Sequence, residues 1–208
     1  MAILLNVPIN EKEEVKALGA KWDNEIKKWY VTDKNEYYKF QKWFSKPYND
    51  FVIIDHLYII TSTQPCFKCG KQTTVVSLAA DTYITFKGEQ YELYDEEINF
   101  IKLHEIESES LLQYLNQNYK FYKDYSYTTK THYLANHCDC CGVLQGNWFL
   151  YSEPDSPFFM TSEQKAKALS VFKIDLPYDI DISANVCWGS GDYMIKEFCK
   201  IQELVLKI

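Results

Sequence analysis

The sequence contains no arginine, because all 22 of its basic residues are lysine. This absence removes the planar guanidinium group, which recognises guanine bases and phosphates through two parallel hydrogen bonds. Sequence-specific reading of DNA is therefore less expected here than in a domain that carries arginine. The chain is instead rich in tyrosine, with 17 among 208 residues, a bias that fits a genome poor in G and C.

Long apolar runs are also missing: none approaches the roughly 18 residues that a membrane-spanning helix needs. The first ten residues have no basic segment and include Pro8, so they do not have the pattern of a secretory signal peptide. We therefore expect a cytoplasmic protein without membrane association, in which cysteines remain reduced. With 47% hydrophobic and 25% charged residues, the chain suits one large or two small globular cores.

Seven cysteines are present, an odd number that argues against a complete set of disulfides. Four of them form two CxxCG motifs that stand 72 positions apart, CFKCG from Cys66 and CDCCG from Cys138. Each motif separates two runs that favour β-strands, so each is expected at the tip of a hairpin, where glycine adopts a positive φ. The flanking runs are 56–62 and 73–79 for the first motif, and 131–136 and 143–150 for the second.

Two such hairpins facing each other resemble a split zinc ribbon, over residues 57–80 and 131–150. Four thiolates of this kind hold Zn²⁺ in a closed tetrahedron that stabilises a fold rather than performing catalysis. A redox pair would need a helix after the motif, whereas both motifs here precede residues that favour strands. We therefore expect one structural zinc, with the ligands that reproduce both the gap and the trailing glycine: Cys66, Cys69, Cys138 and Cys141.

The second motif leaves two alternatives open. Cys140 lies inside it and His137 lies directly before it. Either side chain could replace a ligand if one of the assigned cysteines faced away from the metal.

The first 46 residues predict a strand, a helix, a hairpin and a second helix. The first strand ends before Pro8, and Asn10 suits an N-cap with Glu13 three residues on. Val15 and Leu18 would share the buried face of this helix, which Gly19 would end.

After Gly19, Trp22 and Trp29 flank the turn residues of the predicted hairpin and could pack on each other. Asp33 and Glu36 would open the second helix. Three aromatic residues lie on one face of it at helical spacing: Tyr37, Phe40 and Phe44.

Several short motifs follow one another in this stretch, and these are Leu5-Asn6-Val7-Pro8, Glu11-Lys12, Lys16, Leu18-Gly19-Ala20, Trp22-Asp23, Lys28 and Trp29-Tyr30-Val31. In this order and spacing they resemble a small domain of unknown function found in conjugative plasmid primases and in multidomain proteins of mobile elements. Val15 and Thr32 depart from the pattern, which usually has alanine and proline there. The resemblance implies association with bacterial DNA-processing or mobile-element proteins, and it transfers no catalytic residues.

Between Lys21 and Lys46, seven lysines and four acidic residues alternate with eight aromatic residues. Lysines beside stacking aromatics are typical of proteins that hold single-stranded nucleic acid. A small module also needs its large side chains for its own core, so both interpretations stay open. With a net charge of −7, any binding is expected to be weak, and the candidate contacts are Trp22, Lys27, Lys28, Trp29 and Tyr30.

An insertion at about 81–130 separates the two halves of the predicted ribbon. It contains two runs that favour strands, 82–86 and 90–94, and a predicted helix over 108–122. Acidic residues concentrate at 88–110, with eight acids and one lysine. A charge run of this kind is typical of a solvated face, and it would also suit a docking surface for a basic partner.

No catalytic motif is recognisable, although one carboxylate site is an alternative. Glu153 and Asp155 stand near prolines in a predicted loop. The segment Gly189–Asp192 precedes a predicted C-terminal helix with Ser190 or Asp192 as its N-cap. Paired acids can perform acid–base catalysis, but loops built on aspartate and proline commonly use them only to form turns.

Taken together, the sequence predicts an α+β protein with a small N-terminal module (1–46) and a zinc-ribbon-containing mixed domain (47–208) that carries the acidic insertion. The favoured function is a non-enzymatic accessory or adaptor protein of a bacterial or mobile-element system, with a structural zinc and a protein partner. The first alternative is a weak single-stranded nucleic-acid binder. The second is an enzyme of unrecognised class with a carboxylate site in the 150–192 region.

Overall fold

The computed structural model describes residues 1–88, 90–105, 108–154 and 156–208. The N-terminal module contains a three-stranded antiparallel sheet of order β1-β3-β2. Trp22 lies directly opposite Trp29 in its hairpin, with the ring centroids 5.5 Å apart, as the sequence predicts. The elements of the module are β1 (Ile3–Leu5), the 3₁₀ helix η1 (Ile9–Glu11), α1 (Lys12–Ala17), β2 (Lys21–Asp23), β3 (Lys28–Val31) and the 3₁₀ helix η2 (Lys34–Trp43).

Two predictions about the first helix are wrong. Asn10 does not cap it, because Asn10 lies inside η1 and the chain enters α1 through Glu11 without a side-chain cap. Leu18 is 40% exposed, whereas Val15 is fully buried, because the helix ends at Ala17 and Leu18 is its C-cap. Gly19 follows with a φ of 102°, which is the left-handed ending that the sequence predicts.

The second helix, η2, is a 3₁₀ helix, and it buries the aromatic face that the spacing predicts. Tyr37, Phe40 and Phe44 are each at most 1% exposed. Their cluster continues beyond the module into the large sheet, so one apolar core joins the two parts of the chain. The residues that extend this cluster are Val52, Ile54, Ile84 and Phe86.

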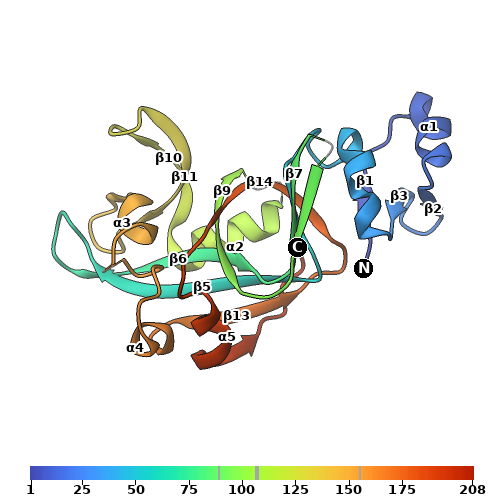
Figure 1. Cartoon of the computed structure of the whole chain (residues 1–208). Coiled ribbons are helices and arrows are strands. Elements are labelled where there is room, and N and C mark those ends of the chain that lie inside the picture. Colours follow the sequence, from blue (N-terminus) through green and yellow to red (C-terminus); the bar gives the residue numbers. More distant parts are fainter. Residues whose placement is uncertain (89, 106–107, 155) are drawn as a thin grey trace.

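A nine-stranded sheet forms the centre of the remaining chain (Figure 1), with the order β15-β13-β5-β6-β9-β14-β4-β7-β8. Neighbouring strands are antiparallel except for the parallel pair β13–β15. The strands are β4 (Phe51–Ile53), β5 (His56–Pro65), β6 (Gln72–Ala80), β7 (Tyr83–Lys87), β8 (Gln90–Tyr94), β9 (Asn99–Glu105), β13 (Ser170–Asp175), β14 (Ile180–Cys187) and β15 (Ile201–Glu203).

Helices cover both faces of this sheet, which confirms the α+β class. α2 (Glu109–Tyr119) packs Leu111 and Leu115 on one face. The other face is covered by α3 (Trp148–Tyr151), α4 (Glu163–Lys167) and α5 (Tyr193–Phe198), through the buried residues Leu150, Ala166 and Ile195. No helix in the described ranges has the length and apolar character needed to cross a membrane.

A second three-stranded sheet, of order β10-β11-β12, carries the later cysteines. Two predicted elements beside it are present but end earlier than expected. The helix predicted over 108–122 ends at Tyr119, because Lys120 takes a left-handed φ of 48° and β10 begins at Phe121. The strand predicted over 143–150 stops at Gln145, and from Trp148 the chain forms α3 to bury Leu150. The strands are β10 (Phe121–Ser126), β11 (Thr131–His137) and β12 (Leu144–Gln145).

The module and the turn between β5 and β6 lie at opposite ends of the molecule (Figure 1). Buried polar contacts fasten the module to the start of β14. The Tyr37 hydroxyl donates to the Asp179 carboxylate at 2.6 Å, and that carboxylate also accepts from the backbone N–H of Asp55 at 3.1 Å. Asp181 accepts at 3.0, 2.6 and 2.7 Å from the Ser45 N–H, the Ser45 hydroxyl and the Asn49 side-chain amide.

The Tyr37 hydroxyl should contribute measurably to stability. Tyr37→Phe keeps the buried ring but removes a hydrogen bond to a buried, charged acceptor. We expect the free energy of unfolding in urea to fall by about 1.5–3 kcal/mol, the range for hydrogen bonds to charged groups. Tyr48→Phe is the matched control, because Tyr48 is 72% exposed and should change stability by less than about 0.5 kcal/mol. Equal effects of the two substitutions would contradict this assignment.

Candidate metal centre

Both CxxCG motifs form hairpin turns with the same backbone hydrogen bonds. In the first, which joins β5 to β6, the Cys66 N–H donates to the Lys71 carbonyl at 2.8 Å and the Gly70 N–H donates to the Cys66 carbonyl at 2.9 Å. The glycines that end the two motifs have φ values of 70° and 69°, which explains why glycine stands there. The second motif repeats both bonds, at 2.9 Å from Cys138 N–H to Val143 and at 3.0 Å from Gly142 N–H to Cys138.

The structure brings the four predicted cysteines together. The Sγ atoms of Cys66 and Cys141 are 3.7 Å apart, and so are those of Cys69 and Cys138. All four sulfurs lie within 4.8 Å of one another. A tetrahedral metal with bonds of about 2.3 Å to sulfur requires sulfur–sulfur edges of about 3.8 Å. The cluster therefore has the spacing to hold a metal ion.

The two alternative ligands lie outside this cluster. Cys140 is exposed, and its backbone N–H points toward the Cys138 sulfur at 3.4 Å. His137 is fully buried, and both of its ring nitrogens face other groups. Nδ1 lies 3.1 Å from the Lys120 carbonyl and Nε2 lies 3.2 Å from the Asp124 carboxylate.

Side chains fasten the second hairpin to the first. The Asn136 side-chain amide accepts from the Val76 N–H at 2.7 Å and donates to the Val76 carbonyl at 2.9 Å. It thereby makes the two bonds that the backbone of a neighbouring strand would make. Asp139 uses its carboxylate and its backbone N–H to bind Thr74 and Thr73, at 2.8 and 2.9 Å. These contacts fix the two hairpins relative to each other through protein atoms alone.

Backbone N–H groups also point at the sulfurs. The Cys141 and Cys140 N–H groups face the Cys138 sulfur at 3.5 and 3.4 Å. The pKa of the Cys138 thiol is lowered to about 6, chiefly by the hydrogen bond from the Cys141 N–H, although burial acts in the opposite direction. The Gln145 side chain donates to the Cys66 sulfur at 3.5 Å. Such donors favour the thiolate, which is the form that binds metals.

Four of the five candidate nucleic-acid contacts share one shallow hollow. Trp22, Lys27, Lys28 and Trp29 line it beside the loop that contains Asn6. Trp22 is 45% exposed, and the Lys28 ammonium donates to the Asn6 side chain at 2.6 Å. Tyr30 is separate from this group, because it follows Trp29 in the same strand and lines a different hollow, together with Gly19 and Asp33.

The alternative carboxylate site does not come together as a pair. Asp155 lies outside the described residues, and Glu153 accepts from the indole N–H of Trp148 at 3.1 Å. Asp192 is 1% exposed and occupies the N-cap position of α5 without a side-chain bond to the helix. Its carboxylate instead accepts from Asn99 at 2.9 Å and from the Gly189 N–H at 3.0 Å. Mainly because it is buried, its pKa is raised to about 6.

The two glycines of the loop before α5 are explained by close packing. A Cβ at Gly191 would lie 2.2 Å from the Met160 carbonyl oxygen, and a Cβ at Gly189 would lie 2.7 Å from the Asp192 carboxylate. A side chain at Gly191 would collide with backbone, and one at Gly189 would displace the Asp192 carboxylate, so close packing accounts for both glycines.

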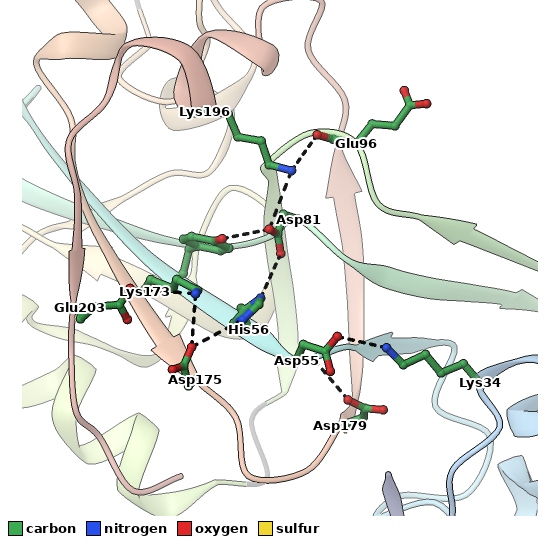
Figure 2. A network of polar contacts seen from close by, with 11 residues as sticks. Lys34, Asp55, His56, Asp81, Glu96, Lys173, Asp175, Asp179, Lys196 and Glu203 are labelled. Atoms are coloured by element: carbon green, nitrogen blue, oxygen red, sulfur yellow. Dashed lines mark hydrogen bonds and ion pairs between the residues drawn. The ribbon is translucent and has the colours of Figure 1, made fainter. Parts of the chain in front are cut away.

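One polar cluster, shown in Figure 2, was not predicted from the sequence. His56 lies between Asp81 and Asp175, with Nδ1 3.9 Å and Nε2 3.5 Å from their carboxylates. The Tyr58 hydroxyl donates to Asp81 at 2.9 Å. The signal was the strand register, because Asp175 lies directly opposite His56 and Asp81 follows the end of β6. Contacts between residues so far apart in sequence can be predicted only when that register is known.

Comparisons with known proteins concern the N-terminal module. A family described as a domain of unknown function (DUF5710) matches residues 3–45. The chain is also similar to two Escherichia coli proteins, each named DNA primase TraC, at 54% and 46% identity over 39 residues. These 39 residues are 19% of this chain but only 4% and 3% of the two primases. No solved structure is significantly similar. The resemblance predicted from the sequence is thereby confirmed.

The buried Asp192 should make stability depend on pH. Its folded-state pKa is raised, so the folded protein holds this proton more tightly than the unfolded chain does. The resulting stabilisation is complete below about pH 4 and is lost as the pH rises through about 6. Relative to Asp192→Asn, wild-type protein should therefore lose about 1–3 kcal/mol of unfolding free energy across that range. Urea unfolding at several pH values measures this difference.

Glu197→Gln provides the matched control for this experiment, because Glu197 is an exposed carboxylate on the same helix. Its difference from wild type should not change with pH. A pH-independent difference for Asp192→Asn would contradict the raised pKa.

Proposed function

We propose that this chain is a non-enzymatic accessory or adaptor protein of a bacterial mobile-element system. One structural Zn²⁺ would hold its larger domain (47–208) together. The observation that carries this proposal is the close set of four sulfurs from two equivalent hairpin turns. The proposed ligands are Cys66, Cys69, Cys138 and Cys141.

Zinc is the metal that suits this donor set best, because Zn²⁺ prefers four tetrahedral ligands and binds thiolates strongly. Four thiolates leave no open position for water, so this ion would not activate a substrate. It would instead hold the β5–β6 hairpin to the β11–β12 hairpin. The need for reduced thiols supports the cytoplasm as the location.

The mobile-element context is supported by the module, since the proteins that match it are named DNA primases. We further propose that residues 1–46 form a first domain that docks on the second. Their shared apolar cluster and the Tyr37–Asp179 hydrogen bond support a fixed arrangement. A two-part chain of this kind, without a recognised catalytic group, suits an adaptor that binds another protein.

The zinc proposal predicts about one zinc ion per chain in purified protein, measured by elemental analysis. Cys138→Ser and Cys141→Ser should each lose the metal and lower the melting temperature, because metal binding contributes directly to folding free energy. Chelation of wild-type protein should have the same effect on stability.

Cys140→Ser is the matched control, since it removes a thiol from the same turn but outside the cluster. It should retain full zinc content. If Cys140→Ser released the metal while Cys138→Ser retained it, the proposed ligand set would be wrong.

Single-stranded nucleic-acid binding is a second candidate function, favoured by the exposed Trp22 beside Lys27, Lys28 and Trp29. Exposed aromatics with nearby lysines can stack bases and contact phosphates. The net charge of −7 opposes this, since a polyanion responds to the summed field of the protein.

We therefore expect a dissociation constant no tighter than about 10⁻⁵ M for an oligothymidine at physiological salt, within the nonspecific range. Changing Lys27 and Lys28 together to glutamate should weaken this binding further, as should added salt. Fluorescence anisotropy with a labelled oligonucleotide measures both effects. A submicromolar complex that resists salt would favour this second function over the adaptor.

A further inference from the structure

A hollow of about 300 Å³ opens beside β8, at the edge of the nine-stranded sheet. Its walls combine aromatic rings with three consecutive acidic residues, and we refer to it as the aromatic–acidic hollow. It is lined by Leu93, Tyr94, Asp95, Glu96, Glu97, Asn99 and Trp188.

The aromatic wall is held in place by a chain of ring contacts that reaches the core. Trp188 is 59% exposed, and its ring lies 4.9 Å from that of Tyr94. Tyr94 stacks on the buried Tyr83 at 4.9 Å, and Tyr83 stacks on Phe51 at 4.9 Å. A tryptophan that is supported on one side and open on the other offers a fixed face to a ligand.

The acidic wall carries charge that protein groups do not neutralise. Within the described ranges, the carboxylates of Asp95, Glu96 and Glu97 have no ion pair or hydrogen bond. The nearby Lys196 is directed elsewhere, because its ammonium binds the Glu96 backbone carbonyl at 2.7 Å and lies 3.8 Å from Asp81. Figure 2 shows the Glu96 carboxylate extending away from Lys196.

The floor of the hollow is a polar side chain held in a fixed position. Asn99 is 3% exposed, accepts from the Tyr83 hydroxyl at 2.8 Å and donates to Asp192 at 2.9 Å. Glu97 is half-buried on the same side. The pKa of Asp192 is raised mainly by burial and also by the charge of Glu97. The Glu97 carboxylate is therefore close enough to act on the residues beneath the hollow.

These walls select a cation. An ammonium or guanidinium group is attracted to the face of tryptophan within about 6 Å of the ring centre, and the carboxylates add direct Coulombic attraction. The same charges repel phosphates, which excludes a nucleic-acid strand at this site.

The adjoining sheet edge indicates that the cation belongs to a polypeptide. β8 is the last strand in the sheet order and pairs with β7 alone among the described residues. An edge strand offers unpaired backbone groups to an extended segment of another chain. Side chains of such a segment alternate between faces, so every second residue would point toward the same side of the sheet.

We propose that an extended, basic segment of a partner protein pairs along β8 and places a lysine or arginine side chain in the aromatic–acidic hollow. This inference rests on the proposed adaptor function, and it names the partner chemistry and the surface that the adaptor would use.

The test uses zinc-loaded, full-length protein and a fluorescein-labelled peptide of alternating lysine and threonine residues. Anisotropy should show saturable binding at low salt, and a peptide with glutamine in place of lysine should not bind. Trp188→Ala and Glu97→Gln should each weaken binding about 3- to 30-fold, the range expected for a cation–π contact and a close charge. Trp188→Phe should retain part of the affinity.

Matched controls separate this hollow from general attraction to an acidic protein. Trp148→Ala removes another tryptophan, 64% exposed, and Glu197→Gln removes an exposed carboxylate; neither should change binding. Circular dichroism and zinc content should be unchanged in all variants.

The proposal is overturned if the lysine peptide does not bind, or if the controls weaken binding as much as Trp188→Ala and Glu97→Gln do. It is also overturned if spermidine binds as tightly as the peptide, because the ligand would then be a free amine. The zinc proposal is tested separately by the metal content. Protein that contains no metal but still binds the peptide would refute only the structural zinc.

Discussion

The structure depends on the ladder between β5 and β6, which pairs Tyr58 with Ala79 at one end and Pro65 with Gln72 at the other. Side chains from its central residues alternate between the two faces of the large sheet, as Ile59 and Ile60 do, and each face has its own core. One end of the ladder leads into the Cys66 turn, and the other end places His56 near Asp81. Any shift of register would disrupt both cores, the cysteine cluster and the contacts of His56 at once.

Much of the candidate metal centre could be predicted because its signals are local. The two-residue gap, the trailing glycine and the β-prone flanks specify a turn whose two sulfurs point the same way, and the second motif repeats them. The register of CDCCG followed from the same rule, since Gly142 trails Cys141. The hydrogen bonds between the two hairpins could not be predicted from local signals, because Asn136 and Val76 are 60 positions apart.

One failure in the fold has a clear physical cause, namely tertiary burial that overrides local preference. The stretch after Gln145 favours a strand by composition, but it turns into α3 and buries Leu150. Leu18 matched the helical period, yet the helix ended one residue before it. Likewise, the aromatic–acidic hollow appeared in the sequence only as a run of charge, because Asn99 and Asp192, 93 positions apart, meet solely in the folded chain.

The pairing of the sulfurs across the two hairpins also sets the order of events during synthesis. Cys66 lies beside Cys141 and Cys69 beside Cys138, which are separations of 75 and 69 positions. At about 5–20 residues per second, the first turn leaves the ribosome roughly 4 to 14 seconds before the second. During that interval the nascent chain offers only the two thiols of the first motif, which are open to oxidation or to a loosely held metal. The proposed zinc would then close a loop of about 70 residues, and the chain would lose the corresponding conformational entropy late in folding.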